Sequence, residues 1–156
     1  MDPMDAAEEA VREYEADLAA TKKAVGRTVR TLTRAIDGFS QAGYDLFVDF
    51  FFDVVAEVKS DVATNAANKT ASEMDADDAV DFAERMITNR ISYGGTETAI
   101  LAILNYYGPS EGEPLLTEIL IADAKIRPAN TRKTRARRKR DRRRSGPVQL
   151  GLPLDE

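Results

Sequence analysis

The chain of 156 residues contains no cysteine, no histidine and no tryptophan. These absences exclude disulfide bonds, thiolate nucleophiles, imidazole acid–base catalysis and the common zinc sites. Carboxylates are the abundant acid–base groups that remain, and each acidic cluster has a structural explanation. We therefore predict that the protein is not an enzyme and that it uses no cofactor and no metal ion.

Long apolar runs are also absent, and none approaches the roughly 20 residues that a membrane-spanning helix needs. The first ten residues, MDPMDAAEEA, are acidic and have no positively charged segment of the kind that opens a secretory signal. We expect a cytoplasmic protein that makes no contact with a membrane.

Charge divides the chain into three predicted parts. Residues 127–144 hold 11 of the 22 basic residues and one acid, for a net charge of +10, whereas residues 1–126 carry −13. The expected parts are an acidic helical domain at 1–126, a basic arm and linker at 127–147 and a terminal peptide at 148–156.

The first 126 residues predict an all-α domain. A helix is expected from about Asp5 to Asp37, because this segment has no proline and repeats an apolar residue at every seventh position. Asp2 or Asp5 is expected to cap its start and Gly38 to follow its end. A second helix, from about Tyr44 to Ala66, would return antiparallel to the first. The repeated apolar positions are Val11, Leu18, Val25, Leu32 and Phe39.

Three shorter helices are expected after this hairpin. The first would run from Asp75 to Ile91, after a polar loop at 63–74. The second would run from Glu97 to Tyr107 with Thr96 as its N-cap. The last would hold Pro114 in its first turn and end at Ile126.

The last two predicted helices and their turn are similar in layout to a helix-turn-helix. Their second helix carries one basic residue, Lys125, against three acids, which would repel DNA phosphates. We therefore disfavour this interpretation. The three acids are Glu113, Glu118 and Asp123.

The second predicted helix is rich in phenylalanine, with too much apolar surface for one neighbour. We expect it to be central or to form the interface of a homo-oligomer. Its acids form a row at four-residue spacing, which we name the acidic ridge: Asp45, Asp49, Asp53, Glu57 and Asp61. A straight hairpin would pair this ridge with basic residues of the first helix, although a metal site or nucleic-acid mimicry stays open. The expected pairs are Arg34 with Asp45, Arg30 with Asp49, Arg27 with Asp53 and Lys23 with Glu57.

The basic arm has no apolar periodicity, so we predict that it is disordered when free. Arginine-rich segments of this kind bind nucleic-acid backbones through phosphates, without reading sequence. Packing on the acidic body of a neighbouring subunit, or a role in solubility alone, are the alternatives. The predicted DNA-binding residues are Arg132, Lys133, Arg135, Arg137, Arg138, Lys139, Arg140, Arg142, Arg143 and Arg144.

The chain ends in Val148-Gln149-Leu150-Gly151-Leu152-Pro153-Leu154-Asp155-Glu156. Residues 149–154 resemble the hexapeptide Q-L-x-L-P-L with which bacterial replication and repair proteins bind the β sliding clamp. The resemblance implies that Gln149, Leu150, Leu152, Pro153 and Leu154 contact the clamp. Gly151 occupies the variable position. A tail that folds back on its own body is the alternative.

These features together predict a DNA-associated adaptor of replication or repair, of bacterial or phage type. Its arm would bind nucleic acid and its terminal peptide would bind the clamp. The alternatives are a phage packaging protein similar in layout to a small terminase subunit, and an inhibitor that occupies the clamp of the host.

Overall fold

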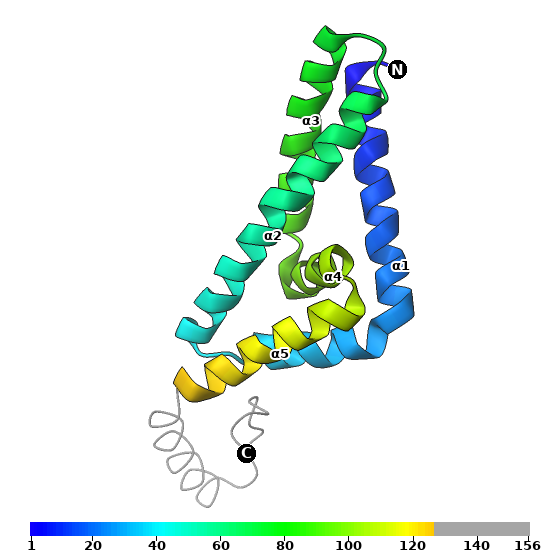
Figure 1. Cartoon of the computed structure of the whole chain (residues 1–156). Coiled ribbons are helices and arrows are strands. Elements are labelled where there is room, and N and C mark those ends of the chain that lie inside the picture. Colours follow the sequence, from blue (N-terminus) through cyan, green and yellow to red (C-terminus); the bar gives the residue numbers. More distant parts are fainter. Residues whose placement is uncertain (127–156) are drawn as a thin grey trace, which may run out of the picture.

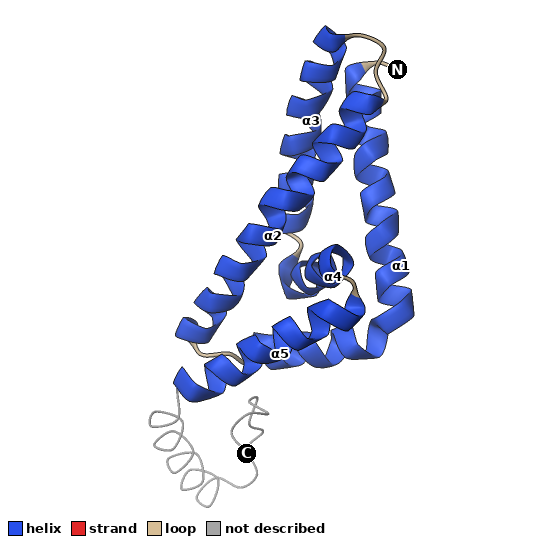
Figure 2. Cartoon of the chain, viewed as in Figure 1, coloured by secondary structure: helices blue, strands red, loops and turns tan. Residues whose placement is uncertain are grey.

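The computed structural model describes residues 1–126, which form five α-helices (Figure 1). Short turns join them, and the described part is helical almost throughout (Figure 2). The predicted all-α fold is confirmed, as is the packing of the two long helices against each other. The helices are α1 (Pro3–Asp37), α2 (Gln41–Asn68), α3 (Glu73–Ser92), α4 (Gly95–Tyr107) and α5 (Pro109–Ile126).

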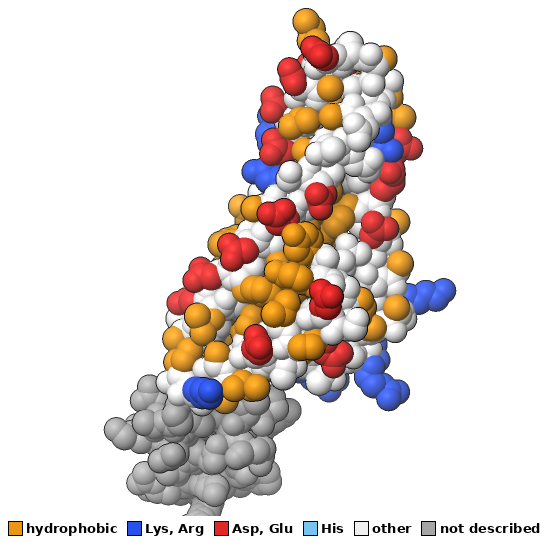
Figure 3. All heavy atoms as spheres, viewed as in Figure 1, with side chains coloured by type: hydrophobic (Ala, Val, Ile, Leu, Met, Phe, Trp, Pro, Cys, Tyr) orange, Lys and Arg blue, Asp and Glu red, His pale blue; other side chains and the backbone are white. Residues whose placement is uncertain are grey.

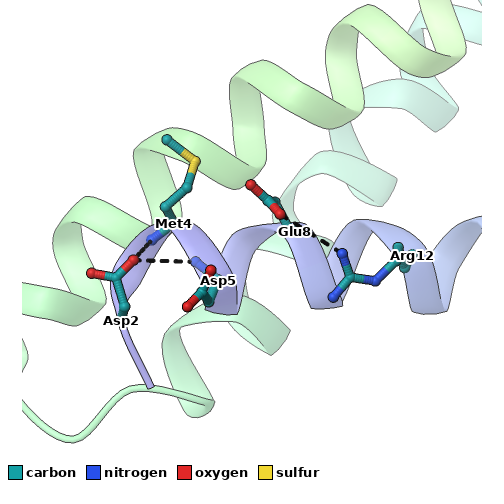
Figure 4. A network of polar contacts seen from close by, with 5 residues as sticks. All are labelled: Asp2, Met4, Asp5, Glu8 and Arg12. Atoms are coloured by element: carbon teal, nitrogen blue, oxygen red, sulfur yellow. Dashed lines mark hydrogen bonds and ion pairs between the residues drawn. The ribbon is translucent and has the colours of Figure 1, made fainter.

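The start of α1 is capped by Asp2, one of the two predicted candidates (Figure 4). Its carboxylate accepts hydrogen bonds from the backbone N–H groups of Met4, at 3.2 Å, and Asp5, at 3.4 Å. Pro3 occupies the first helical position, where its missing N–H costs nothing. One turn later Glu8 and Arg12 form an exposed pair at 3.7 Å, of a kind that contributes about 0.3–0.5 kcal/mol.

The predicted polar loop at 63–74 is wrong over its first half, because α2 continues to Asn68. Alanine has the highest helix propensity, and Ala63 and Ala66 are buried in the core. The polar residues of this segment therefore led to a predicted helix end that is too early in the sequence. Helix α3 is capped by Ser72, whose hydroxyl accepts a hydrogen bond from the N–H of Asp75 at 3.2 Å.

The starts of α4 and α5 also differ from the predictions. Gly94 is the N-cap of α4, whereas the hydroxyl of Thr96 donates to Asp37 at 2.7 Å and so fastens α4 to the end of α1. Helix α5 begins at Pro109 and Pro114 lies inside it. Gly108 precedes this start with φ of 84°, a backbone conformation that glycine adopts without strain.

Helix α1 bends at Val25, whose φ of −130° and ψ of 35° interrupt the helical backbone. Before the bend, α1 runs beside α3 and the second half of α2; after it, α1 turns along α5 (Figure 1). Helices α1, α2 and α5 thus outline a triangle with α4 inside it (Figure 1).

Helix α4 explains why the two long helices separate. Its residues Ala99–Leu104 are all buried, and α4 packs against each of the other four helices. A helix that is apolar on every side must be surrounded, and each fully buried leucine or isoleucine contributes about 1.5–3 kcal/mol. The phenylalanines of α2 meet this core, since Phe47 and Phe51 are buried. Helix α2 packs against each of the other four helices, whereas its place in a homo-oligomer stays a prediction.

The predicted ion pairs between α1 and the acidic ridge do not form within residues 1–126. The alignment expected of a straight antiparallel hairpin holds far from the turn, where Glu13 of α1 contacts Asn65 and Lys69 at the end of α2. Near the turn it fails, because the bend at Val25 and the insertion of α4 separate the two helices. The pairs that are absent are Arg34–Asp45, Arg30–Asp49, Arg27–Asp53 and Lys23–Glu57.

Candidate functional site

The predicted contact residues for DNA and for the clamp all lie outside the described residues. The first group spans 132–144 and the second 149–154. The structure nevertheless fixes where this part of the chain starts, because α5 ends at Ile126. The surroundings of that end decide which surfaces of the body lie next to the arm.

The end of α5 is attached to the turn between α1 and α2 through Asp123. One carboxylate oxygen of Asp123 accepts two hydrogen bonds from Ser40, from its backbone N–H at 3.1 Å and its hydroxyl at 2.7 Å. Asp123 is 0% exposed. The same Ser40 is the N-cap of α2 and accepts a hydrogen bond from the N–H of Gly43 at 3.1 Å.

Gly43 allows this close approach of α5. A Cβ built at this position would lie 2.6 Å from Cγ of Asp123, which is closer than real contacts permit. Glycine is therefore required here for space, whereas Gly38 has a negative φ of −91° that any residue can adopt.

Asp123 corrects one step of the sequence interpretation. Of the three acids predicted to repel DNA phosphates, Asp123 is fully buried, and only Glu113 and Glu118 are exposed. The available signal was its spacing, since Asp123 lies seven residues after the buried Leu116 and so on the same face of the helix.

A second feature is a row of arginines on α1 after the bend, which we name the basic stripe: Arg27, Arg30 and Arg34. All three are exposed, and within the described part of the chain none forms an ion pair. Lys22, before the bend, pairs with Glu97 at 2.7 Å. Figure 3 shows Lys and Arg side chains projecting around the bend and the second half of α1.

The acidic ridge lies along the opposite long helix, and red side chains follow the course of α2 in Figure 3. All five ridge carboxylates are exposed. Asp45 accepts a hydrogen bond from the side-chain amide of Gln41 at 2.9 Å. No ridge carboxylate pairs with a basic residue of 1–126.

An aromatic cluster lies between the ridge and α4. Phe50 stacks on Tyr107 with ring centroids 5.8 Å apart, and Tyr106 meets Tyr107 edge-on at 4.9 Å. Partial burial and then the charge of Glu57 raise the pKa of the Tyr106 hydroxyl. This part of the surface therefore combines apolar and acidic groups, as the orange and red atoms of Figure 3 show.

A polar network joins the first half of α1 to the end of α2. Lys69 lies 2.8 Å from Glu13, and hydrogen bonds from Lys69 and Asn65 hold the pKa of the Glu13 carboxyl below its ordinary value of 4.5. The same contact raises the pKa of Lys69. The neighbouring Tyr14 hydroxyl is buried and has no hydrogen-bond partner among residues 1–126. Burial raises its pKa, as do the charges of Asp17 and Asp61.

No group of three or more acidic residues within 1–126 is arranged to hold a metal ion. The grooves along α3 are shallow and solvent-exposed, and the one against α2 is lined by charges of both signs, among them Lys59, Asp81 and Arg85. None of the five described helices is both long and apolar enough to cross a membrane.

Comparisons with protein-family models, with curated proteins and with solved structures found no match to this chain.

Proposed function

We propose that this protein is a non-enzymatic, DNA-associated adaptor of bacterial or phage type that acts in replication or repair. Its arm binds the nucleic-acid backbone, and its terminal peptide binds a bacterial β sliding clamp. The helical body joins copies of the chain into a homo-oligomer through α2. The observation that carries the proposal is the terminal hexapeptide Gln149–Leu154, which follows directly on the basic arm.

The chemistry of the terminal peptide supports clamp binding. Leu152 and Leu154 can fill an apolar pocket, Gln149 offers directional hydrogen bonds, and Pro153 reduces the entropy lost when the peptide is ordered. Such a short peptide binds weakly alone. Attachment to DNA through the same chain raises its effective concentration near the clamp, so two weak contacts act together.

The clamp contact is tested with the full chain and purified bacterial β clamp by surface plasmon resonance. We expect micromolar binding that the double variant Leu152→Ala, Leu154→Ala abolishes. The variant Gly151→Ser is the control, because it changes the variable position and should keep the affinity. An unmodified chain that shows no binding at high micromolar clamp would contradict the proposal.

The arm is tested by the binding of a short DNA duplex over about 50–200 mM salt. Each phosphate neutralised adds about 0.9 to the slope of log affinity against log salt. Neutralising four arm arginines should therefore lower that slope by about 3.6. A slope that does not change would show that the arm does not bind DNA. The substitutions are Arg137→Gln, Arg138→Gln, Arg142→Gln and Arg143→Gln.

A further inference from the structure

The basic stripe of α1 is the largest group of described cations without acidic partners. Between Asp17 and Asp37 helix α1 carries five basic residues and no acid. Of these, the stripe residues Arg27, Arg30 and Arg34 are exposed on the continuous helix after the bend. Their spacing of three and four residues places them on one face, where like charges repel each other.

The fold itself does not neutralise these charges. The acidic ridge was the expected partner, but α4 lies between the two long helices near the turn (Figure 1). Thr31 and Thr33 take positions three or four residues from the stripe arginines, where acids would form ion pairs along the same helix. The stripe is thus a fixed cationic surface directed to the outside of the fold.

The stripe lies next to the place where the arm leaves the body. Arg34 is three residues from the end of α1, and the turn that follows is hydrogen-bonded through Ser40 to Asp123, three residues before the end of α5. Helices α1 and α5 are also in contact. The chain therefore enters its basic arm beside the same end of the molecule that carries the stripe (Figure 1).

We infer that Arg27, Arg30 and Arg34 form a second, preformed binding site for the phosphate backbone of duplex DNA beside the root of the arm. This inference rests on the proposed function. The three guanidinium groups span two helical turns, roughly 10 Å, which matches the reach of a few consecutive phosphates. Phosphate contacts from a rigid helix fix how a protein sits on the duplex, so the stripe orients the body while the arm adds affinity.

The test compares three triple variants of the full chain by fluorescence anisotropy with a short labelled duplex. The stripe variant is Arg27→Gln, Arg30→Gln, Arg34→Gln. Its matched control is Arg12→Gln, Arg85→Gln, Arg90→Gln, which removes the same charge from exposed arginines of α3 and the first half of α1. The third variant changes the stripe residues to lysine and keeps their charge. Circular dichroism verifies that each variant is folded.

We expect the stripe variant to lose about tenfold in affinity and about 2–3 units of salt slope, as the loss of three phosphate contacts requires. The matched control should stay within about twofold of the unmodified chain, and the lysine variant should keep the slope. Equal affinities for the stripe variant and its control would overturn the inference.

The remaining outcomes separate this inference from the proposed function. An unmodified chain that does not bind duplex at low salt would overturn both. If the arm substitutions lower the slope of log affinity against log salt but the stripe substitutions do not, the proposed function stands and the inference alone is overturned. A stripe variant that changes only the oligomer mass, measured by light scattering without DNA, would assign the stripe to the acidic ridge of a second copy and overturn the inference.

Discussion

Asp123 shows how one buried acid determines the geometry at the base of the molecule. It connects the last helix to the N-cap of α2 through two hydrogen bonds with Ser40. A buried carboxylate destabilises the folded state unless it accepts hydrogen bonds. Helix α5 must therefore place Asp123 against Ser40. The orientation of α5, and with it the origin of the arm, depends on this contact.

The variant Asp123→Ala should lower the free energy of unfolding by about 1–3 kcal/mol, because two partly buried donors of Ser40 lose their acceptor. Gly43→Ala should cost a similar amount through the clash with the Asp123 carboxyl. In the double variant the carboxyl group is gone and only the Cβ of residue 123 stays close to the new Cβ, at 2.8 Å, so the cost should be smaller than the sum of the two. Urea unfolding followed by circular dichroism measures all three, and strictly additive losses would contradict the proposed contact.

Glu13 gives the fold a defined dependence on pH. Its pKa is lowered in the folded state by hydrogen bonds from Lys69 and Asn65, so its contribution is complete above the ordinary value of 4.5 and is lost as the pH falls through the lowered pKa. Glu13→Gln should therefore be less stable than the unmodified chain at pH 7, and the difference should shrink below about pH 4.5.

Urea unfolding at several pH values tests this dependence on Glu13. Lys69→Met is the control background, where the effect of Glu13→Gln on the pH profile should largely disappear. A stability difference that stays constant down to about pH 3 would show that the Glu13–Lys69 pair does not contribute.

At the scale of the helix, the bend in α1 has the greatest effect on the architecture. It lies at Val25, and Gly26 follows directly. A Cβ at Gly26 would be 3.4 Å from the side chain of Arg30, so there is room for alanine. The glycine is therefore a cost to the helix rather than a requirement of the bend.

Gly26→Ala should raise the free energy of unfolding by about 0.5–1 kcal/mol, because alanine restricts the unfolded chain and favours the helix. Thermal and urea unfolding measure the change. Destabilisation would mean that the bend needs the conformational freedom of glycine at this position.

Helix α2 buries only part of its apolar residues, and Phe52 is 54% exposed. The proposed homo-oligomer would cover this side chain. Phe52→Ser should then lower the mass measured by light scattering to that of a monomer, while Tyr93→Ser, which changes an aromatic residue that is 85% exposed in the turn before α4, should leave the mass unchanged. A monomeric unmodified chain would contradict the proposed oligomer. A closed ring of many subunits would favour the packaging alternative.

At the scale of the whole molecule, the described core lies within residues 1–126, from Ala6 in α1 to Leu116 in α5. Charge is separated along the same boundary, with an acidic body and a basic arm. Under the proposed function, this separation would allow the body to stay folded while the arm and the terminal peptide bind other molecules.

A chain truncated after Ile126 should therefore fold by itself. We expect the helical circular dichroism of the full body and one cooperative thermal transition, with a midpoint within about 5 °C of that of the full chain. A truncated chain that unfolds non-cooperatively would show that residues after Ile126 complete the fold.

Much of the fold was predictable because helix formation is local. Apolar spacing identified the buried positions Val11, Leu18 and Leu32, and the cap at Asp2 was recognisable from residue type. The basic arm and the clamp-like peptide were also recognisable from the sequence, and both stay predictions because they lie outside the described residues. The sequence identified the residues of the basic stripe only as partners in predicted ion pairs with the acidic ridge, and those pairs do not form within residues 1–126.

The sequence by itself determined the helices, most of the core residues and the division of charge, because these follow from interactions within a few residues or from composition. Only the tertiary structure decided the bend at Val25, the burial of Asp123 and the outward direction of the stripe. These three features depend on which helix faces pack together when the apolar surfaces of all five helices are buried at the same time. Since α4 is apolar on every side, it had to be enclosed, and enclosing it moved the basic half of α1 away from the acidic ridge.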